Sequence, residues 1–248
     1  MKKMLIIVII LLISFISAKS ILAVKSGNSL PKVKAVDTPL VTKEVALKKE
    51  APILPESKLL DVPLLNQMDK PLLYNGCEVT SLAMVLNYNG IKVTKNELAK
   101  NIKTVPLNYS NGKKGNPNAG FVGDMAHGPG LGVYNGPVFE LAQKYAGNKA
   151  VNLTGSPFTD LLKKISQGHP VWIITTTNFA PVSVFQTWDT PQGKIDITFS
   201  EHSVVITGYD ENNIYINDPY GTKNKKLDRD NFIKAWEQMG KQAIVIES

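Results

Sequence analysis

Residues 75–90 read Asn-Gly-Cys-Glu-Val-Thr-Ser-Leu-Ala-Met-Val-Leu-Asn-Tyr-Asn-Gly, and this stretch decides the fold. Its apolar side chains recur at helical spacing, at positions Val79, Leu82, Ala83, Val85 and Leu86. Asn75-Gly76 is a turn signal, and Gly90 is typical of the residue that follows a helix. We therefore predict a helix from Cys77 to Asn89, with the single cysteine of the chain at its first position.

The elements around this helix change type once along the chain. Before Gly168 the patterns predict helices over 94–102, 137–145 and 157–167, preceded by a short strand over 59–65. After Gly168 the patterns predict strands over 171–177, 184–188, 195–199, 203–209, 214–217 and 242–246, with one helix that Asp228 caps and that runs to Gln238. An N-terminal helical half followed by an antiparallel sheet is an α+β fold.

A long glycine-rich segment, from Pro106 to Gly136, interrupts the helical half and shows neither a helical nor a strand period. Segments of this length within a compact domain usually carry function. We therefore expect it to flank or cover a binding cleft rather than to form core, with His127 as a residue that contacts the substrate.

Composition excludes several classes of protein. With 43% hydrophobic and 20% charged residues, the chain can bury a core, so it is neither a coiled coil nor a disordered chain. The formal charge of +7 lies mostly in the first 60 residues, and residues 61–248 hold 18 basic and 17 acidic groups, so no nucleic-acid-binding face is predicted. One cysteine excludes an internal disulfide framework and a cysteine-rich zinc site.

The N-terminus has the pattern of an export signal. Lys2 and Lys3 precede an apolar run from Met4 to Ala18. We predict that residues 1–23 are a signal peptide, cut after Ser20, or an uncleaved membrane anchor, since the apolar stretch approaches the length of a span. Residues 24–58 contain four prolines and no aromatic residue, so we predict a flexible linker. Both alternatives place the domain, residues 59–248, outside the cytoplasm, secreted or anchored to the outer face of the membrane.

Cys77 is the first candidate for chemistry. At the start of a helix, free N–H groups and the helix dipole favour a thiolate, so we expect a nucleophile with a lowered pKa. The alternative is a buried, unreactive core residue.

A nucleophilic thiol needs a base, and the chain has three histidines. His202 opens a predicted strand, and Asp218 ends the next strand of the same hairpin, so Asp218 can lie near His202 and orient its ring. His169 follows a helix stop and is expected to interact with that helix end. Gln67, ten residues before Cys77, could donate to an oxyanion together with the Cys77 backbone N–H.

Three motifs in this order resemble the peptidase C39-like group of papain-fold cysteine peptidases. They are Gly76-Cys77-Glu78-Val79-Thr80-Ser81-Leu82-Ala83-Met84-Val85-Leu86, Glu201-His202-Ser203-Val204-Val205-Ile206-Thr207-Gly208-Tyr209, and Ile214-Tyr215-Ile216-Asn217-Asp218-Pro219. The resemblance covers about residues 59–248. It implies a papain-like fold, with Cys77 as nucleophile, His202 as base, Asp218 as the residue that orients it and Gln67 as oxyanion donor.

One departure from that pattern lies beside the nucleophile. Many relatives have Gly-Pro after the cysteine, whereas Glu78-Val79 stands here. A Glu78 carboxylate directed at the sulfur would raise the thiol pKa, and one directed away would favour the helix N-terminus.

These observations favour an exported cysteine peptidase that cleaves peptides or proteins through an acyl-enzyme on Cys77, without metal or organic cofactor. The first alternative is a papain-fold hydrolase of peptidoglycan peptides, although the Asp-Cys motif of such enzymes is absent because Gly76 precedes Cys77. The second is a catalytically silent binding module tethered to the membrane.

Overall fold

A computed structural model describes residues 54–247, so the predicted export signal and nearly all of the predicted linker lie outside the described residues. No helix within residues 54–247 has the length and apolar character needed to cross a membrane. The helices are α1 (Cys77–Tyr88), α2 (Lys95–Asn101), α3 (Asn135–Ala146), α4 (Phe158–Ser166) and α5 (Arg229–Gln238), with a 3₁₀ turn η1 (Gly147–Lys149). The strands are β1 (Lys58–Leu59), β2 (Thr104–Val105), β3 (Phe121–Val122), β4 (Ala150–Asn152), β5 (Val171–Thr176), β6 (Gln186–Thr190), β7 (Gly193–Ile197), β8 (Glu201–Tyr209), β9 (Asn213–Asp218), β10 (Thr222–Asp228) and β11 (Ala243–Ile246).

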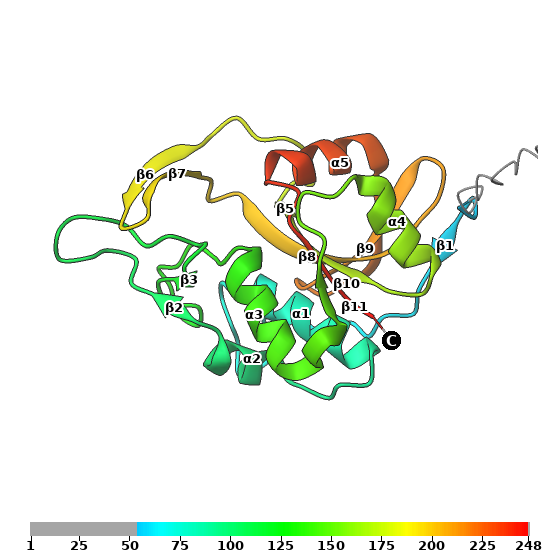
Figure 1. The fold of residues 1–248 in the computed structure, drawn as a ribbon, viewed down its shortest axis with the longest axis horizontal. Helices are drawn as coiled ribbons and strands as arrows, with labels where there is room; N and C mark the ends of the chain where they lie inside the picture. The colour runs from blue at the N-terminus through cyan, green and yellow to red at the C-terminus, as the bar shows by residue number, and fades with distance from the viewer. Residues whose placement is uncertain (1–53, 248) are drawn as a thin grey trace, which may run out of the picture. The chain divides into compact units, whose positions relative to one another are not determined.

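The main sheet is antiparallel and has the strand order β10-β9-β8-β5-β11-β4, with β1 added beside the end of β8. Helices α1, α2 and α3 lie on one side of it, and α4 and α5 lie on the other (Figure 1). Because both faces are covered, β5 and β8 are buried along their whole length, and β5 begins with the apolar run Val-Trp-Ile-Ile. The predicted α+β class, helices first and antiparallel sheet second, is confirmed.

Helix α1 is the central helix of the core. The sequence predicted burial of one face, but every residue from Cys77 to Leu86 is buried, because α2 and α3 pack on the sides that the sheet does not cover. Two hydrogen bonds hold its first turns against the sheet. The Trp172 indole N–H of β5 donates to the Glu78 carbonyl at 3.0 Å, and the Ser81 hydroxyl donates to the Ser203 carbonyl of β8 at 3.1 Å.

The opposite face of the sheet is closed by α4 and α5. Phe158 of α4 packs edge-on against Phe232 and Trp236 of α5, with ring centroids 6.3 Å and 5.2 Å apart. Asp228 caps α5 by accepting the Asn231 backbone N–H at 2.9 Å, as the sequence predicted. This second layer keeps β5 and β8 rigid beneath the residues that α1 faces.

Two strands of the structure differ from the sequence prediction. The strand expected over 59–65 is paired only at Lys58 and Leu59, since Pro63 lacks an N–H and the chain turns toward the end of β9. Strand β10 was not predicted at all, because its sequence Thr-Lys-Asn-Lys-Lys-Leu-Asp is rich in lysine. Such a composition suits an edge strand, where charge discourages pairing with another chain.

The glycine-rich segment is partly core, which corrects the expectation that it would only flank a cleft. Its short strand β3 pairs in parallel with β2, and Phe121, Val122 and Val133 are fully buried. Glycine is required at Gly123, where φ is +90° and a Cβ would lie 2.4 Å from the Pro129 carbonyl oxygen.

Candidate active site

His202 and Asp218 are brought together by the β8–β9 hairpin. The ladder pairs Val205 with Asn217, so Asp218 and His202 are diagonal neighbours on one face of the sheet. His202 Nε2 lies 3.0 Å from Asp218 Oδ1, and both side chains are almost fully buried. Since a carboxylate accepts, Nε2 carries the hydrogen and Nδ1 is left as the ring atom that can accept a proton.

Aromatic and charged neighbours hold this pair in place. Tyr220 stacks on the His202 ring with centroids 5.3 Å apart, and Phe179 lies on it at 6.1 Å. Burial alone would raise the pKa of Asp218, but the hydrogen bond and charge of His202, the Tyr220 backbone N–H and nearby Lys225 lower it below its usual value. Asp218 is therefore an anion in the folded protein, able to orient the ring and stabilise its protonated form.

Cys77 is the first residue of α1, and the residue before it must be glycine. A Cβ at Gly76 would lie 2.5 Å from the Leu73 Cβ, so the turn before the helix needs glycine there. The thiol is buried, and Sγ lies 3.3 Å from Glu78 Oε2. Burial, the Glu78 and Glu201 charges and the hydrogen bond to Glu78 raise the pKa of Cys77 well above its usual value, against the opposing effect of the Ser203 backbone N–H. The lowered pKa expected from the helix start is therefore wrong for the resting protein, because burial and carboxylates outweigh the helix dipole.

Cys77 and His202 lie on elements that pack against each other, and no hydrogen bond joins the thiol to the imidazole. The Ser203 backbone N–H that reaches Cys77 belongs to the residue after His202, and α1 packs directly on β8. Within residues 54–247, the hydrogen-bond partner of Sγ is Glu78, and none joins it to His202. The structure thus brings the predicted base, His202, and Asp218 together and leaves the sulfur turned toward a different carboxyl group, that of Glu78.

Gln67 lies beside the turn that precedes Cys77. Its side chain is buried, and its Nε2 donates to the Leu73 carbonyl at 3.3 Å and the Tyr74 carbonyl at 3.0 Å, whereas Oε1 has no hydrogen-bond partner. Its role as an oxyanion donor stays a prediction, and that role requires one amide hydrogen to leave a backbone carbonyl.

Two buried carboxyl groups stand next to the Cys77 thiol, and sequence reasoning found only one of them. Glu78 is fully buried, and its Oε1 accepts the Val133 backbone N–H at 2.6 Å. Glu201, the first residue of β8, is buried with Oε1 unpartnered. Burial raises the pKa of Glu78 to about 7, and burial and the Glu78 charge raise the pKa of Glu201 well above its usual value. A glutamate directly before the predicted base His202 was the available signal for Glu201.

One group of side chains within residues 54–247 has donor atoms close enough to share a cation. One atom each from Cys77, Glu78 and Glu201 lie within 4.8 Å of one another. Thiolate and carboxylate are zinc ligands, but burial raises the pKa of all three groups, so a cation would have to compete with protons for them.

The other two histidines lie outside this cluster. His127 is exposed and pairs with Asp124 at 3.2 Å within its own loop. His169 follows α4, and its backbone N–H donates to the Lys164 carbonyl at 2.9 Å, which closes the helix end. The loop of His127 nonetheless flanks the nucleophile, because the Asn75 backbone N–H donates to the Met125 carbonyl at 2.9 Å and the Asn75 side chain to the Asp124 carbonyl at 3.1 Å.

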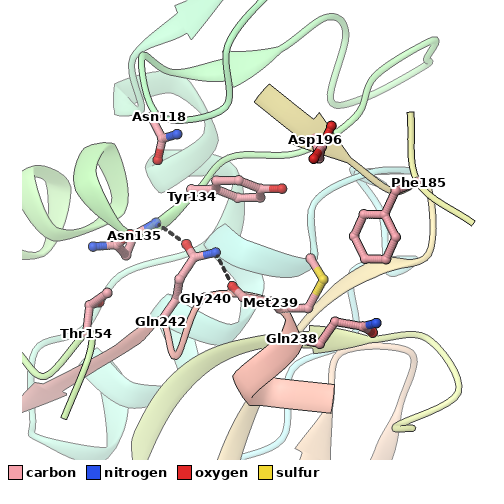
Figure 2. Close-up of a pocket in the computed structure, with 10 residues that line it drawn as sticks. All are labelled: Asn118, Tyr134, Asn135, Thr154, Phe185, Asp196, Gln238, Met239, Gly240 and Gln242. Carbon is pink, nitrogen blue, oxygen red and sulfur yellow. Dashed lines mark hydrogen bonds between the residues drawn. The ribbon is translucent and has the colours of Figure 1, made fainter. Parts of the chain in front are cut away.

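A pocket of about 280 Å³ lies where the start of α3, the β6–β7 hairpin and the turn between α5 and β11 meet. Figure 2 shows the Tyr134 ring near its centre, with Gln242 and Asn135 on one side and Asp196 and Phe185 on the other. None of the four predicted site residues lines it. Tyr134 connects the two regions, since burial, Glu201 and Glu78 all raise the pKa of its hydroxyl.

The chain matches the model of the peptidase C39-like family over residues 59–244. It belongs to that family. It is 58% identical over 221 residues to the uncharacterized protein YvpB of Bacillus subtilis, which covers 89% of this chain and 86% of that protein. A crystal structure of a candidate C39-like peptidase from Bacillus anthracis is 46% identical and superposes with a TM-score of 0.75, over 78% of this chain and 98% of the other. Xylellain, a cysteine protease from Xylella fastidiosa, is 13% identical with a TM-score of 0.40, over 79% of this chain and 87% of that one. The predicted family is confirmed.

Proposed function

We propose that this C39-like protein is a cysteine peptidase that hydrolyses peptide bonds through an acyl-enzyme on Cys77. The observation that carries the proposal is the buried His202–Asp218 pair, joined at 3.0 Å on the face of β8 on which the N-terminus of α1 packs. A buried carboxylate is costly to place unless hydrogen bonds compensate it, and here the His202 ring supplies one. Its free ring atom, Nδ1, belongs to the residue beside Ser203, whose N–H reaches the sulfur.

The chemistry follows from these positions. His202 Nδ1 accepts the thiol proton as Sγ attacks the substrate carbonyl, and Asp218 stabilises the imidazolium that forms. The carbonyl oxygen gains charge beside the Cys77 backbone N–H at the start of α1, where the first N–H groups have no partner within the helix. The imidazolium then protonates the leaving amine, and water releases the acid from sulfur in a second cycle.

The proposed substrate is a peptide or protein, bound without nucleic acid or cofactor. The glycine-rich segment supports this, because its backbone approaches Asn75 on one side and Glu78, through Val133, on the other. Glycines at such approaches let an extended chain lie close to the backbone. Fragments of peptidoglycan peptides belong in the same assay, as the alternative substrate class.

The proposed location is outside the cytoplasm, secreted or held at the outer face of the membrane by residues 1–23. Lys2, Lys3 and the apolar run that follows support it. Cell fractionation with N-terminal sequencing of the mature protein tests it, and a soluble cytoplasmic protein that keeps Met1 would contradict it.

The activity is tested by incubating the protein with a peptide library and with purified wall peptides, and identifying new termini by mass spectrometry. Cys77→Ala is the matched variant, because it removes the nucleophile and keeps a small apolar side chain at a buried position. Cleavage by the natural chain and none by Cys77→Ala is the expected result. Equal cleavage by both would show that Cys77 is not the nucleophile, and cleavage by neither on any substrate would favour a silent binding module; either result would contradict the proposal.

A further inference from the structure

The sulfur of Cys77 is held by a carboxyl pair that the peptidase mechanism above does not use. Glu78 reaches back across the start of α1, so that Oε2 accepts from the thiol at 3.3 Å while Oε1 accepts the Val133 N–H at 2.6 Å. Glu201 stands beside it, and one donor atom of each of the three residues falls within 4.8 Å of the others. Gly132 leaves room for both acids, since a Cβ there would lie 2.5 Å from Glu201 Oε2 and 2.6 Å from Glu78 Oε1.

The hydrogen-bond partners decide which acid is ionised. The Glu78 carboxylate accepts from its own backbone N–H, from the Val133 N–H and from the Cys77 thiol. Glu201 Oε1 accepts from nothing. Two buried carboxylates this close cannot both be charged at neutral pH, so the proton belongs on Glu201, where no donor stabilises an anion. The negative charge belongs on Glu78, directly beside the sulfur.

The groups that face this cluster from other elements do not compensate that charge. From the segment before α3 comes the neutral phenol of Tyr134, and from the turn after β9 comes the phenol of Tyr220. From β8 comes His202, whose Nε2 is committed to Asp218. Lys225 lies at Asp218, 3.4 Å from Oδ2, and not at Glu78. Within residues 54–247, the sulfur therefore has an anion as its nearest charged neighbour.

We propose that Glu78, kept anionic by a proton held on Glu201, acts as a positioning residue that keeps Cys77 a neutral thiol turned away from His202 until substrate arrives. A thiolate–imidazolium pair is therefore not formed in the resting protein. The thiol hydrogen passes to His202 Nδ1 only as the sulfur attacks. The S–H bond breaks as the N–H bond forms, the S–C bond forms as the carbonyl electron pair moves to oxygen, and the same proton later leaves with the amine.

This inference rests on the proposed function for its role in catalysis, but its main test does not need turnover. Iodoacetamide reacts with thiolates, so the rate of alkylation of the single cysteine against pH reports the ionisation of Cys77 directly. The full-length natural chain should give a midpoint above about 8.5, the value for a free thiol, and above its own midpoint when unfolded in urea. A native midpoint at or below the unfolded one would overturn the proposal, with no variant needed.

The decisive variant is Glu78→Gln, which keeps an oxygen for the Val133 N–H and replaces the anion at the sulfur by an amide that can donate. Its midpoint should fall by at least one pH unit, so that alkylation at pH 8 is about tenfold faster. Glu140→Gln is the matched control, because Glu140 is exposed on α3, and its profile should coincide with that of the natural chain. If the pH profile of Glu78→Gln coincides with that of the natural chain, Glu78 serves only to bind the Val133 backbone N–H, and the proposal is wrong.

Two further measurements separate the remaining explanations. Infrared spectra at pH 8 should show a protonated carboxyl band that disappears in Glu201→Gln, and its absence from the natural protein would overturn the assignment of the proton. Treatment with EDTA should leave the alkylation rate unchanged. If EDTA alone accelerates alkylation as much as Glu78→Gln does, a bound cation and not a carboxylate holds the sulfur, and the proposal fails.

Turnover then tests the catalytic part alone. If the protein cleaves peptides, the acidic limb of kcat/KM should lie well above pH 3–4, the range in which thiols in preformed imidazolium pairs titrate. If the limb lies near pH 3–4 and the alkylation results are as expected, Glu78 has no role in catalysis, but Cys77 is still a neutral thiol in the resting protein. If no substrate is turned over, the proposed peptidase function is wrong, but the conclusion from alkylation about the Cys77 thiol is unaffected.

Discussion

His202 and Asp218 lie on neighbouring strands of a buried hairpin, whereas Cys77 lies at the start of a helix against a long glycine-rich segment. In the first region the ladder register and the rings of Tyr220 and Phe179 leave the imidazole one orientation, with Nε2 on Asp218. In the second, the sulfur bonds to Glu78 and not to the base. The His202–Asp218 pair thus already has the geometry that the proposed mechanism needs, whereas the Cys77 thiol does not.

The difference has a physical origin in how each half is held. Strands β8 and β9 are fixed by backbone hydrogen bonds along the ladder and by α4 and α5 behind them. The thiol needs only rotation about one side-chain bond to leave Glu78, and the S–H hydrogen bond that it would give up there is a weak one. Changes in the two halves should therefore have different signatures, large losses of rate in the sheet half and shifts in pH dependence in the helix half.

The largest effect is expected at His202. His202→Ala removes the group that accepts the thiol proton and returns it to the leaving amine, so kcat/KM should fall by about 10⁴-fold. His127→Ala should leave kcat within about twofold and act mainly on KM, because His127 is exposed and pairs only with Asp124. Peptide cleavage assays of both variants check this, and a dead His127→Ala beside an active His202→Ala would reverse the assignment of the base.

A smaller loss is expected at Asp218. Asp218→Asn removes the negative charge that stabilises the imidazolium but keeps an oxygen for the Nε2 hydrogen, and Tyr220 still stacks on the ring. We expect kcat/KM to fall by roughly 10²-fold, less than for His202→Ala. Lys225→Met is the control, since it removes a cation 3.4 Å from the same carboxylate without touching the ring nitrogen. A loss as large for Lys225→Met would show that the overall charge, and not the orientation of His202, is what matters.

The sheet half was predictable from sequence, and the helix half only in part. A histidine at a strand start and an aspartate at the end of the next strand must lie near each other in an antiparallel hairpin. The positions of His202 and Asp218 in the sequence were therefore enough to predict that they are neighbours. Burial around Cys77 depends on α2, α3 and the glycine-rich segment, which pack from distant parts of the chain. No local sequence pattern shows that Cys77 is desolvated by these distant segments. For this reason the sequence predicted a lowered pKa for Cys77, whereas burial raises it. The same holds for β10, whose lysines obscure a strand that pairing with β9 creates.

Stability should depend on pH through the helix half. Burial raises the pKa of Glu78 from its usual value to about 7, so between about pH 4.5 and 7 the folded protein binds more protons than the unfolded chain. The stabilisation is complete below pH 4.5 and is lost as the pH rises through 7, by roughly 3 kcal/mol for a shift of this size. Thermal unfolding from pH 5 to 8 should therefore show a falling Tm, and Glu78→Gln should flatten it. A Tm that rises over this range in the natural chain and is unchanged by Glu78→Gln would contradict the raised pKa of Glu78.

The smallest effect concerns the N-terminal boundary of the folded domain, where residues 54–57 lie beside the end of β8. The predicted linker was expected to contribute nothing to folding, yet Leu54 packs on the core and the Tyr209 hydroxyl, at the end of β8, donates to the Pro55 carbonyl at 3.1 Å. Tyr209→Phe removes that hydrogen bond and keeps the ring, so the free energy of unfolding in urea should fall by about 1 kcal/mol. Tyr145→Phe is the matched control, because its hydroxyl lies at the surface between α2 and α3 and should matter less. Catalysis and the pH profile of Cys77 should be unchanged in both variants, since neither residue touches the site. Should Tyr209→Phe unfold no more readily than Tyr145→Phe, residues 54–57 belong to the linker and β1 marks the first residue of the fold.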